Sequence, residues 1–391
     1  MSATAKAMVL TAFGQPLELR EFPWPALEPG AVLARVTAAG ICGSDLDIAS
    51  GHDPRVHLPM ILGHEGVGVI ADLGGSKRDL FGQELAVGDA IVWHRAVTCG
   101  RCVYCAVKKQ PSLCLTRKVY GISLPCDEPP HLNGCYADHL YVRPESEIIK
   151  LPAVARGAGV PPAASTRGIA GETPAPRGAA ALVSATCSGA TAAHAVDLAN
   201  IHPGDTVAVM GPGPLGIYAA AFAFDRGASQ VVMLGTGRSP QRLQLAESFG
   251  CVPVNISETT EGRRRELLAD LTHGLGADSV LDCAGTAASV REAIGLCARG
   301  GTVTIPGVAV PIGEIPLRPY EDLAVRNVNL QGVWVSDARH LWEALSLAQS
   351  GKYPLDQLVT HTFPLARANE ALEALRSRQA MKVVLTGDDP V

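Results

Sequence analysis

The chain has 391 residues, which is enough for two or three domains of ordinary size. Hydrophobic residues make up 47% and charged residues 18%, a composition that supplies buried cores and excludes global disorder. The formal charge of −5, without a long basic run, excludes an electrostatic footprint for nucleic acid or a membrane surface. The apolar stretches stop well short of a membrane span, and no signal segment opens the sequence. We therefore expect a cytoplasmic protein that binds neither nucleic acid nor a membrane.

The first 150 residues predict a barrel-like, mostly antiparallel β domain. Turns of Gly, Pro and Asp separate short runs that are rich in β-branched residues. These runs are KAMVLTAF (6–13), AVLARVTAAG (31–40), EGVGVIADLG (65–74) and ELAVGDAIVWH (84–94).

Two motifs of this domain, GICGSDL and GHEGVGVI, carry candidate metal ligands. They contain Cys42, His64 and Glu65, and the later segment ATCSGATAAH adds the sulfur of Cys187. A catalytic zinc takes three protein ligands and keeps one position open for water or substrate. Cys42, His64 and Cys187 make up such a set, although each of them alone also fits a buried core residue.

A second candidate metal site lies in the segment CGRCVYCAVKKQPSLC, within a lobe at about 95–120. Its sulfurs come from Cys99, Cys102, Cys105 and Cys114, spaced C-x2-C-x2-C-x8-C. Four thiolates this close in sequence form the closed tetrahedral set of a structural zinc. Disulfides fit less well, because the 11 cysteines are an odd number in a long chain without a signal segment.

The composition changes abruptly at residues 156–180. This segment consists almost entirely of Ala, Gly, Pro, Ser, Thr and Arg, with few large apolar residues. Such a composition buries too little surface to offset the entropy of ordering it. We therefore expect a flexible surface insertion between two structured parts, and we assign it no function.

Residues 188–330 alternate between strand-like and helix-like runs, which predicts a doubly wound parallel sheet. The predicted strands are TVAVM (206–210), QVVML (230–234), VPVNI, SVLDCAG and GTVTIPGVAV. Between the last two, a predicted helix extends through AIGLCARG. The predicted domains are therefore 188–330 for nucleotide binding, and 1–187 together with 331–391 for catalysis. In this last part, two helices precede the strand MKVVLT, which we expect to rejoin the first domain's sheet.

The first of these strands runs directly into a glycine motif of the form G-x-G-x-x-G. Gly211 makes the tight turn, Gly213 admits the diphosphate of a dinucleotide, and Gly216 allows the helix to pack closely on the sheet. Leu215, inside the motif, is counted with the cofactor-binding residues. The motif in this context predicts a dinucleotide site.

The residues after the second strand favour NADP over NAD. A carboxylate at that strand end binds the ribose hydroxyls of NAD and repels a 2′-phosphate. Here Gly235 or Gly237 takes that place, and Arg238 and Arg242 follow nearby. Arginines pair well with a phosphate, although solvated arginines on a loop are the competing interpretation.

Taken together, these motifs resemble the medium-chain, zinc-dependent alcohol dehydrogenase family over nearly the whole chain apart from 156–180. The matching segments are GICGSDL, GHEGVGVI, the four-cysteine lobe, GPGPLG and the closing KVVLT. The resemblance implies an α/β protein with a GroES-like β-barrel catalytic domain and a doubly wound parallel Rossmann domain. It also implies two zinc ions per chain, one catalytic and one structural.

The resemblance further implies roles for residues around the catalytic zinc. Cys42, His64 and Cys187 bind the metal, and Glu65 beside it ligates it transiently. Asp45 accepts a hydrogen bond from His64 and orients the imidazole.

Three further positions match the family's proton path and cofactor contacts. Ser44 accepts the proton of the substrate hydroxyl and passes it outward. Asp47 stands where the family often has a histidine, so its lower intrinsic pKa is expected to alter the pH profile. Lys382, in the last strand, is placed like the basic residue that contacts the cofactor diphosphate.

The function implied is zinc-dependent, NAD(P)-linked interconversion of an alcohol and an aldehyde or ketone. One alternative is reduction of an activated C=C bond, or cyclisation of a biosynthetic intermediate, with zinc only structural. Another is a nucleotide-binding protein without catalysis. The expected partner is a small-molecule alcohol or carbonyl substrate, and the resemblance suggests a homodimer or homotetramer.

Overall fold

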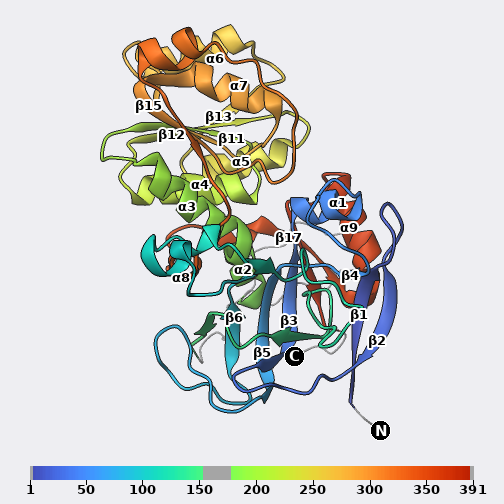
Figure 1. The fold of residues 1–391 in the computed structure, drawn as a ribbon. Helices are drawn as coiled ribbons and strands as arrows, with labels where there is room; N and C mark the ends of the chain where they lie inside the picture. The colour runs from blue at the N-terminus through green and yellow to red at the C-terminus, as the bar shows by residue number, and fades with distance from the viewer. Residues whose placement is uncertain (1–2, 153–177, 388–391) are drawn as a thin grey trace. The chain divides into compact units, whose positions relative to one another are not determined.

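The computed structural model describes residues 3–152 and 178–387, so most of the predicted insertion at 156–180 lies outside the described residues. The chain divides into two compact units (Figure 1). The first consists of Met1–Cys187 and Leu355–Val391, and the second of Ser188–Pro354. The second unit continues past the predicted end at 330, because helix α8 (Ala338–Gln349) packs on helix α3 (Ala190–Ala199).

Within the described residues, the first unit contains sheets of three, seven and two strands. The three-stranded sheet has the order β2-β1-β4, with β1 (Thr4–Leu10), β2 (Glu18–Pro23) and β4 (Met60–Ile61). The seven-stranded sheet runs β10-β6-β5-β3-β18-β17, with β9 also paired to β3. Its members are β3 (Val32–Ile41), β5 (Glu65–Leu73), β6 (Ala90–Trp93), β9 (His139–Val142), β10 (Ile148–Lys150), β17 (Val359–Pro364) and β18 (Lys382–Thr386). The small pair joins β7 (Ala96–Val97) to β8 (Lys118–Val119).

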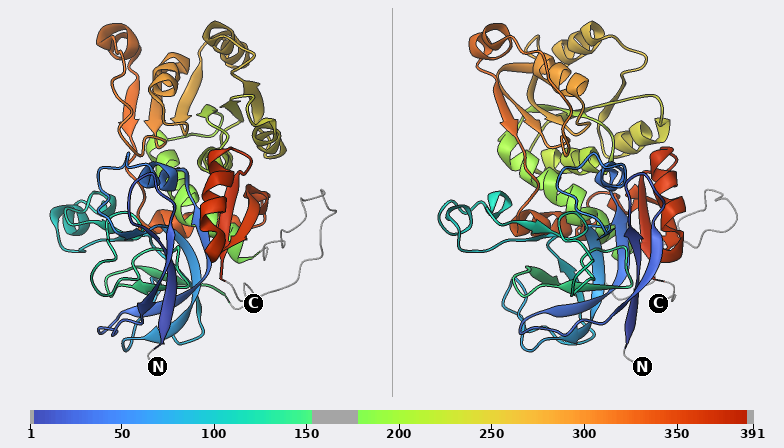
Figure 2. Two further views of the ribbon diagram at one scale, coloured as in Figure 1. Left: turned by 90° about the vertical axis from the view of Figure 1, so that its right-hand side faces the viewer. Right: turned by 45° about the vertical axis from the view of Figure 1, so that its right-hand side comes forward.

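The predicted antiparallel β domain is confirmed, and so is the return of the last strand. β18 pairs antiparallel with β3 and parallel with β17, and β3 pairs antiparallel with β5. Figure 2 shows the C-terminal segment in red beside the blue N-terminal strands. The short helices of this unit are α1 (Gly43–Ala49), α2 (Ala179–Ser184) and α9 (Ala368–Arg376). Apolar side chains from the strands and from α9 form one continuous core.

The second unit contains a six-stranded sheet whose described strands are all parallel, as predicted. Its order is β13-β12-β11-β14-β15-β16, the order typical of dinucleotide-binding sheets. The strands are β11 (Thr206–Met210), β12 (Gln230–Gly235), β13 (Val252–Asn255), β14 (Ala277–Asp282), β15 (Cys297–Ile305) and β16 (Asn329–Gly332). The central strands β11 and β12 are almost entirely apolar and buried because helices cover both faces of the sheet, whereas the edge strands β13 and β16 are mostly not buried.

The helices α4 (Pro214–Asp225), α5 (Pro240–Ser248), α6 (Glu261–Leu271) and α7 (Ala287–Leu296) connect these strands. Helices α6 and α7 contact each other on one face of the sheet, and α3 and α4 contact each other on the opposite face (Figure 1). The predicted helix through AIGLCARG is too long, because β15 already begins at Cys297 and pairs there with Ala277. Local apolar pattern alone does not mark that boundary.

The helical run Ala179–Ala199 is the one membrane-span candidate among the described residues, on length and composition alone. Of its apolar window, 89% is buried within the protein. Burial of this kind is what a core helix shows, so the run is weak evidence for a membrane.

Candidate active site

The ends of two paired strands bring the first candidate ligands together. Strand β3 ends just before Cys42, and β5 begins with Glu65 directly after His64. In the antiparallel register Gly40 lies opposite Glu65, so the end of one strand meets the start of the other. A Cβ atom on Gly40 would lie 2.1 Å from Oε2 of Glu65, so only glycine leaves room for this carboxylate.

The donor atoms of Cys42, His64, Glu65 and Cys187 all lie within 4.8 Å of one another. Cys187 comes from the π-helical turn Ala185–Gly189 that follows α2, far from the other three in sequence. The sequence analysis predicted this group, and the structure brings all four together. His64, Glu65 and Cys187 are buried.

Asp45 lies beside two of these ligands. Its Oδ2 atom accepts hydrogen bonds from the backbone N–H of Cys42, at 2.8 Å, and from the hydroxyl of Tyr136, at 3.0 Å. Its Oδ1 atom lies 3.3 Å from Nδ1 of His64, and both side chains are fully buried. The two atoms are close enough for an ion pair but do not form the predicted hydrogen bond, so the orienting role of Asp45 stays a prediction. With Nδ1 facing Asp45, Nε2 of His64 is the atom available to a metal. Tyr136 is a contributor that sequence reasoning missed.

The electrostatics favour a charged imidazole while no metal is bound. Burial disfavours the imidazolium, but the Asp45 carboxylate and the Cys42 thiol outweigh it and raise the pKa of His64 to about 10. A hydrogen bond from the Cys187 thiol holds the pKa of Cys42 well below its usual range. Ser44 lies on the metal side of the ring, with Oγ 3.4 Å from Nε2 of His64.

Glu65 forms a buried ion pair with Lys382, the first residue of β18. Burial raises the pKa of Glu65 to about 7, although the Lys382 ammonium lowers it in part. Burial also works against the Lys382 ammonium, but Glu65 outweighs it and raises the pKa of that group. The side chain of Lys382 is only 2% exposed, so the structure favours a role beside Glu65 over the predicted contact with a cofactor diphosphate.

Arg95, between β6 and β7, is a further residue that the sequence analysis missed. It is buried, and its Nη1 atom donates a hydrogen bond to the sulfur of Cys187. The two residues lie 92 positions apart in the sequence, so no local sequence pattern predicts their contact.

Asp47 lies at the edge of the group. Its Oδ1 atom is 4.0 Å from Nδ1 of His52, and its side chain is 38% exposed. Burial raises the pKa of Asp47, although nearby His52 opposes this. A carboxyl group with a raised pKa between the site and solvent suits the relay role, which stays a prediction.

The donor set fits a zinc ion. The group offers two sulfur donors, one imidazole nitrogen and one carboxylate oxygen. Zinc accepts each of these donor types in tetrahedral geometry. Among the described residues, Oε1 of Glu65 is buried without a hydrogen-bond partner, as expected of an atom facing a metal position.

The second cluster also has the arrangement of a metal site. The sulfurs of Cys99, Cys102, Cys105 and Cys114 lie within 4.8 Å of one another. The Cys102–Cys105 and Cys99–Cys114 sulfur pairs are 3.6 Å apart, far longer than the roughly 2.05 Å of a disulfide. Backbone N–H groups of Arg101 and Cys102 lower the pKa of the Cys99 thiol to about 6. Backbone hydrogen bonds also lower the pKa of Cys102, so these two favour the thiolate form that binds zinc. Burial instead raises the pKa of Cys105 to about 12, so the surroundings of that thiol disfavour its thiolate.

In the second unit, the glycine motif follows β11 as predicted. Gly211 has φ +99°, in the left-handed region that favours glycine. A Cβ on Gly216 would lie 2.0 Å from the carbonyl oxygen of Gly211, so the helix packs against the turn only with glycine there. Helix α4 begins after Gly213 with Pro214 in its first turn, and its N-terminus can face a diphosphate.

The end of β12 carries no carboxylate. Gly235 is its last residue, and a Cβ there would meet Pro212 at 2.6 Å. Arg238 is exposed just before α5, and Arg242 is half-buried with Nη1 4.0 Å from the Cβ position of Gly213. At the end of β14, burial raises the pKa of Asp282 to about 6, although N–H groups of the following turn lower it in part.

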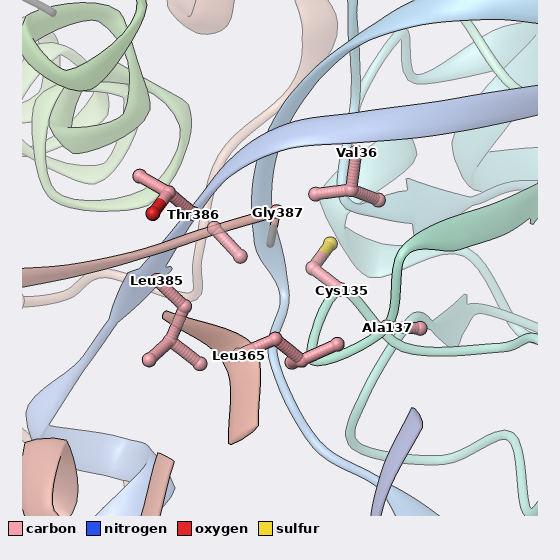
Figure 3. A pocket seen from close by; sticks show the side chains of 8 residues that line it. Val36, Cys135, Ala137, Leu365, Leu385, Thr386 and Gly387 are labelled. Carbon is pink, nitrogen blue, oxygen red and sulfur yellow. The ribbon is translucent and has the colours of Figure 1, made fainter. Parts of the chain in front are cut away.

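The small pocket in Figure 3 belongs to the first unit and is separate from the metal ligands. Its lining is mostly apolar and includes Val36, Cys135, Leu365, Leu385 and Thr386. It offers no charged group for catalysis.

Hydride transfer to a nicotinamide nucleotide, assisted by an electrophilic metal, is the chemistry that these two units support. This places the chain in the class of metal-dependent dehydrogenases. Residues 28–153 match the alcohol dehydrogenase GroES-like domain, and residues 214–350 match the zinc-binding dehydrogenase domain. The chain belongs to the medium-chain, zinc-dependent alcohol dehydrogenase family, and its activity is the interconversion of alcohols and carbonyl compounds.

Similarity to individual proteins extends over nearly the whole chain. The 5-exo-hydroxycamphor dehydrogenase of Pseudomonas putida is 30% identical over 363 residues, which cover 91% of this chain and 92% of that one. The sorbitol dehydrogenase of Halalkalibacterium halodurans is 31% identical and covers 98% of this chain and 100% of its own. The crystal structure of an alcohol dehydrogenase from Thermotoga maritima is similar with a TM-score of 0.89 and 40% identity, covering 99% and 100% of the two chains.

Proposed function

We propose that Cys42, His64 and Cys187 hold a catalytic zinc and that the enzyme uses NADP to oxidise an alcohol or reduce a carbonyl group. The observation that carries this proposal is the convergence of these donors with Glu65 within 4.8 Å, in the fold of a dehydrogenase family. The bound zinc would supply a Lewis acid that polarises the substrate oxygen.

The protein's own residues perform the remaining steps. Asp45 keeps the imidazole of His64 oriented, so that Nε2 points to the metal position. Ser44, 3.4 Å from that atom, takes the proton of the substrate hydroxyl. Asp47 passes the proton towards solvent, assisted by its partly buried position.

The proposed preference for NADP rests on the end of β12. A glycine stands where a carboxylate would bind the ribose of NAD, and Arg242 lies beside the glycine turn with Arg238 nearby. A zinc-binding dehydrogenase from Sinorhizobium meliloti, 25% identical with a TM-score of 0.79, is described as bound to NADP.

Two experiments test these assignments. Cys42→Ser and His64→Ala are expected to abolish turnover and remove one zinc per chain while the structural zinc is retained. Full activity of either variant, with that zinc absent by elemental analysis, would refute the mechanism. Arg242→Ala is expected to raise KM for NADP at least about tenfold more than KM for NAD, whereas Arg265→Ala, on an exposed face of α6, changes neither. A parent enzyme that prefers NAD would refute the arginine assignment.

The substrate is a small alcohol or the corresponding carbonyl compound. The relatives act, by their names, on a polyol and on a hydroxylated camphor, so a screen of polyols and alicyclic secondary alcohols is the natural first panel. A C=C reductase with only a structural zinc would not require the Cys42, His64 and Cys187 group. We further propose a cytoplasmic homodimer or homotetramer, which sedimentation of the zinc-loaded protein would test.

A further inference from the structure

Arg95 brings a permanent positive charge into contact with one of the proposed zinc ligands, Cys187. The residue is 6% exposed, and its Nη1 atom donates a hydrogen bond to the sulfur of Cys187. Its backbone is fixed on both sides, because the carbonyl of Arg95 accepts from Tyr120 N–H at 3.1 Å and His94 N–H donates to the Glu147 carbonyl at 2.8 Å. The backbone that carries the guanidinium is therefore held in place, and the bond to Cys187 holds the guanidinium itself.

The charges of the buried group indicate what Arg95 does there. With zinc bound, four anionic side chains surround the metal: Cys42, Asp45, Glu65 and Cys187. The divalent ion and the Lys382 ammonium neutralise three of these four charges. The Arg95 guanidinium neutralises the fourth, and it does so in contact with a sulfur ligand. Buried charges persist when they are paired in this way.

A hydrogen bond to a thiolate draws electron density from the sulfur. The metal then receives less charge from that ligand and stays a stronger electrophile. Arginine suits this function because it is charged at every working pH and holds its donors in a rigid plane.

We propose that Arg95 is a positioning residue that raises the electrophilicity of the catalytic metal through the Cys187 thiolate. This inference rests on the zinc site proposed above. It orients the sulfur, balances its charge and makes the metal a better acceptor for the substrate oxygen. The role is separate from ligation, because the guanidinium has no lone pair to offer a metal.

Cobalt substitution tests this independently of turnover. Thiolate-to-cobalt charge-transfer absorption reports the electron density on the sulfur ligands. In Arg95→Met the bands of the catalytic site are expected to move to lower energy, while those of the four-cysteine lobe stay fixed as an internal reference. The zinc enzyme should lose kcat by about tenfold to a hundredfold, with KM nearly unchanged.

Two further variants complete the comparison. Arg95→Lys keeps the charge without the planar fork, so a smaller shift in the same direction is expected, and it carries the test if Arg95→Met does not fold. Arg143→Met is the control, since that arginine of the same unit bonds Asn133 instead, and its spectrum should match the parent.

Two results would overturn the assignment. One is an unshifted catalytic band in a folded Arg95 variant. The other is a loss confined to KM for negatively charged substrates, which would make Arg95 a substrate contact. A parent protein that binds cobalt only in the lobe would instead refute the zinc site itself, and the tuning role with it.

Discussion

Replacing Lys382 by methionine isolates the energetic role of one buried ion pair. The side chains of Lys382 and Glu65 are 2% and 0% exposed, so the variant leaves the Glu65 carboxylate without its partner in a site that water does not reach. Breaking a buried pair from one side costs about 3–5 kcal/mol. For a unit on the order of 200 residues, each kcal/mol lowers Tm by roughly 2–4 °C, so the expected drop is about 10 °C.

Calorimetry of the zinc-loaded protein measures this drop, and the chain offers a matched control. Lys352 pairs with Asp225 on the surface, where the two side chains are 55% and 36% exposed. Such exposed pairs contribute under about 1 kcal/mol, so Lys352→Met should leave Tm nearly unchanged. The double variant Lys382→Met/Glu65→Gln should regain much of the lost stability, because no buried charge is left alone.

A drop no larger for Lys382→Met than for Lys352→Met would refute this reasoning. The Lys382→Met variant also tests the predicted contact between Lys382 and the cofactor diphosphate. If Lys382 binds the cofactor, the affinity for NADP will fall in the single variant, as measured by fluorescence titration. If it acts only beside Glu65, that affinity will stay the same.

Three more predictions concern other parts of the chain. Asp282→Asn should raise the free energy of unfolding above pH 6 by up to about 3 kcal/mol and change it little near pH 4. The pKa of Asp282 is about 6 in the folded state against 3.8 in the unfolded state, so between these values the folded state binds a proton that the unfolded state has lost. The stability of the parent protein therefore falls as pH rises through that window, and the asparagine variant does not share this loss. Chemical denaturation at several pH values checks this, and an equal effect at all of them would contradict it. Gly40→Ala should displace Glu65 and lower kcat. In the control Gly43→Ala the new Cβ meets nothing within 4 Å, so that variant should fold and retain zinc. Equal activity of the two variants would rule out the close approach of Glu65 to Gly40. Cys102→Ser should release the structural zinc alone, and elemental analysis showing both ions retained would disprove the four-sulfur site.

Local patterns were sufficient for much of the second unit. The run TVAVM is β11 in full, because a short apolar run bounded by turn residues and followed by a glycine motif has few other structures open to it. The boundary between α7 and β15 was wrong, since Leu296, Cys297 and Ala298 are apolar in either structure and the pairing with β14 decides the outcome. The end of the unit at 354 was missed because it depends on packing between helices.

The grouping of the candidate metal ligands was predictable because their residue types are chemically rare and their motifs are local. The residues around them were not. Arg95 meets Cys187 across 92 positions, and Tyr136 meets Asp45 across 91. Arginine and tyrosine are common in many settings, so only the register of the strands shows which of them reach the site. The same applies to Lys382, whose strand pairing places it at Glu65.

Two strands of the first unit, β17 and β18, are synthesised long after its other described strands. Ribosomes complete β3 and β5 early, then synthesise the entire second unit before β18 with Lys382 emerges. Until then Lys382 is missing beside the Glu65 carboxylate, and the part of β3 that pairs with β18, at 38–41, has no partner on that edge. The contiguous second unit can fold while translation continues, whereas the first unit is complete only after β18 has been synthesised. Completion of the active centre is therefore expected to follow the synthesis of β18, later than that of the whole second unit.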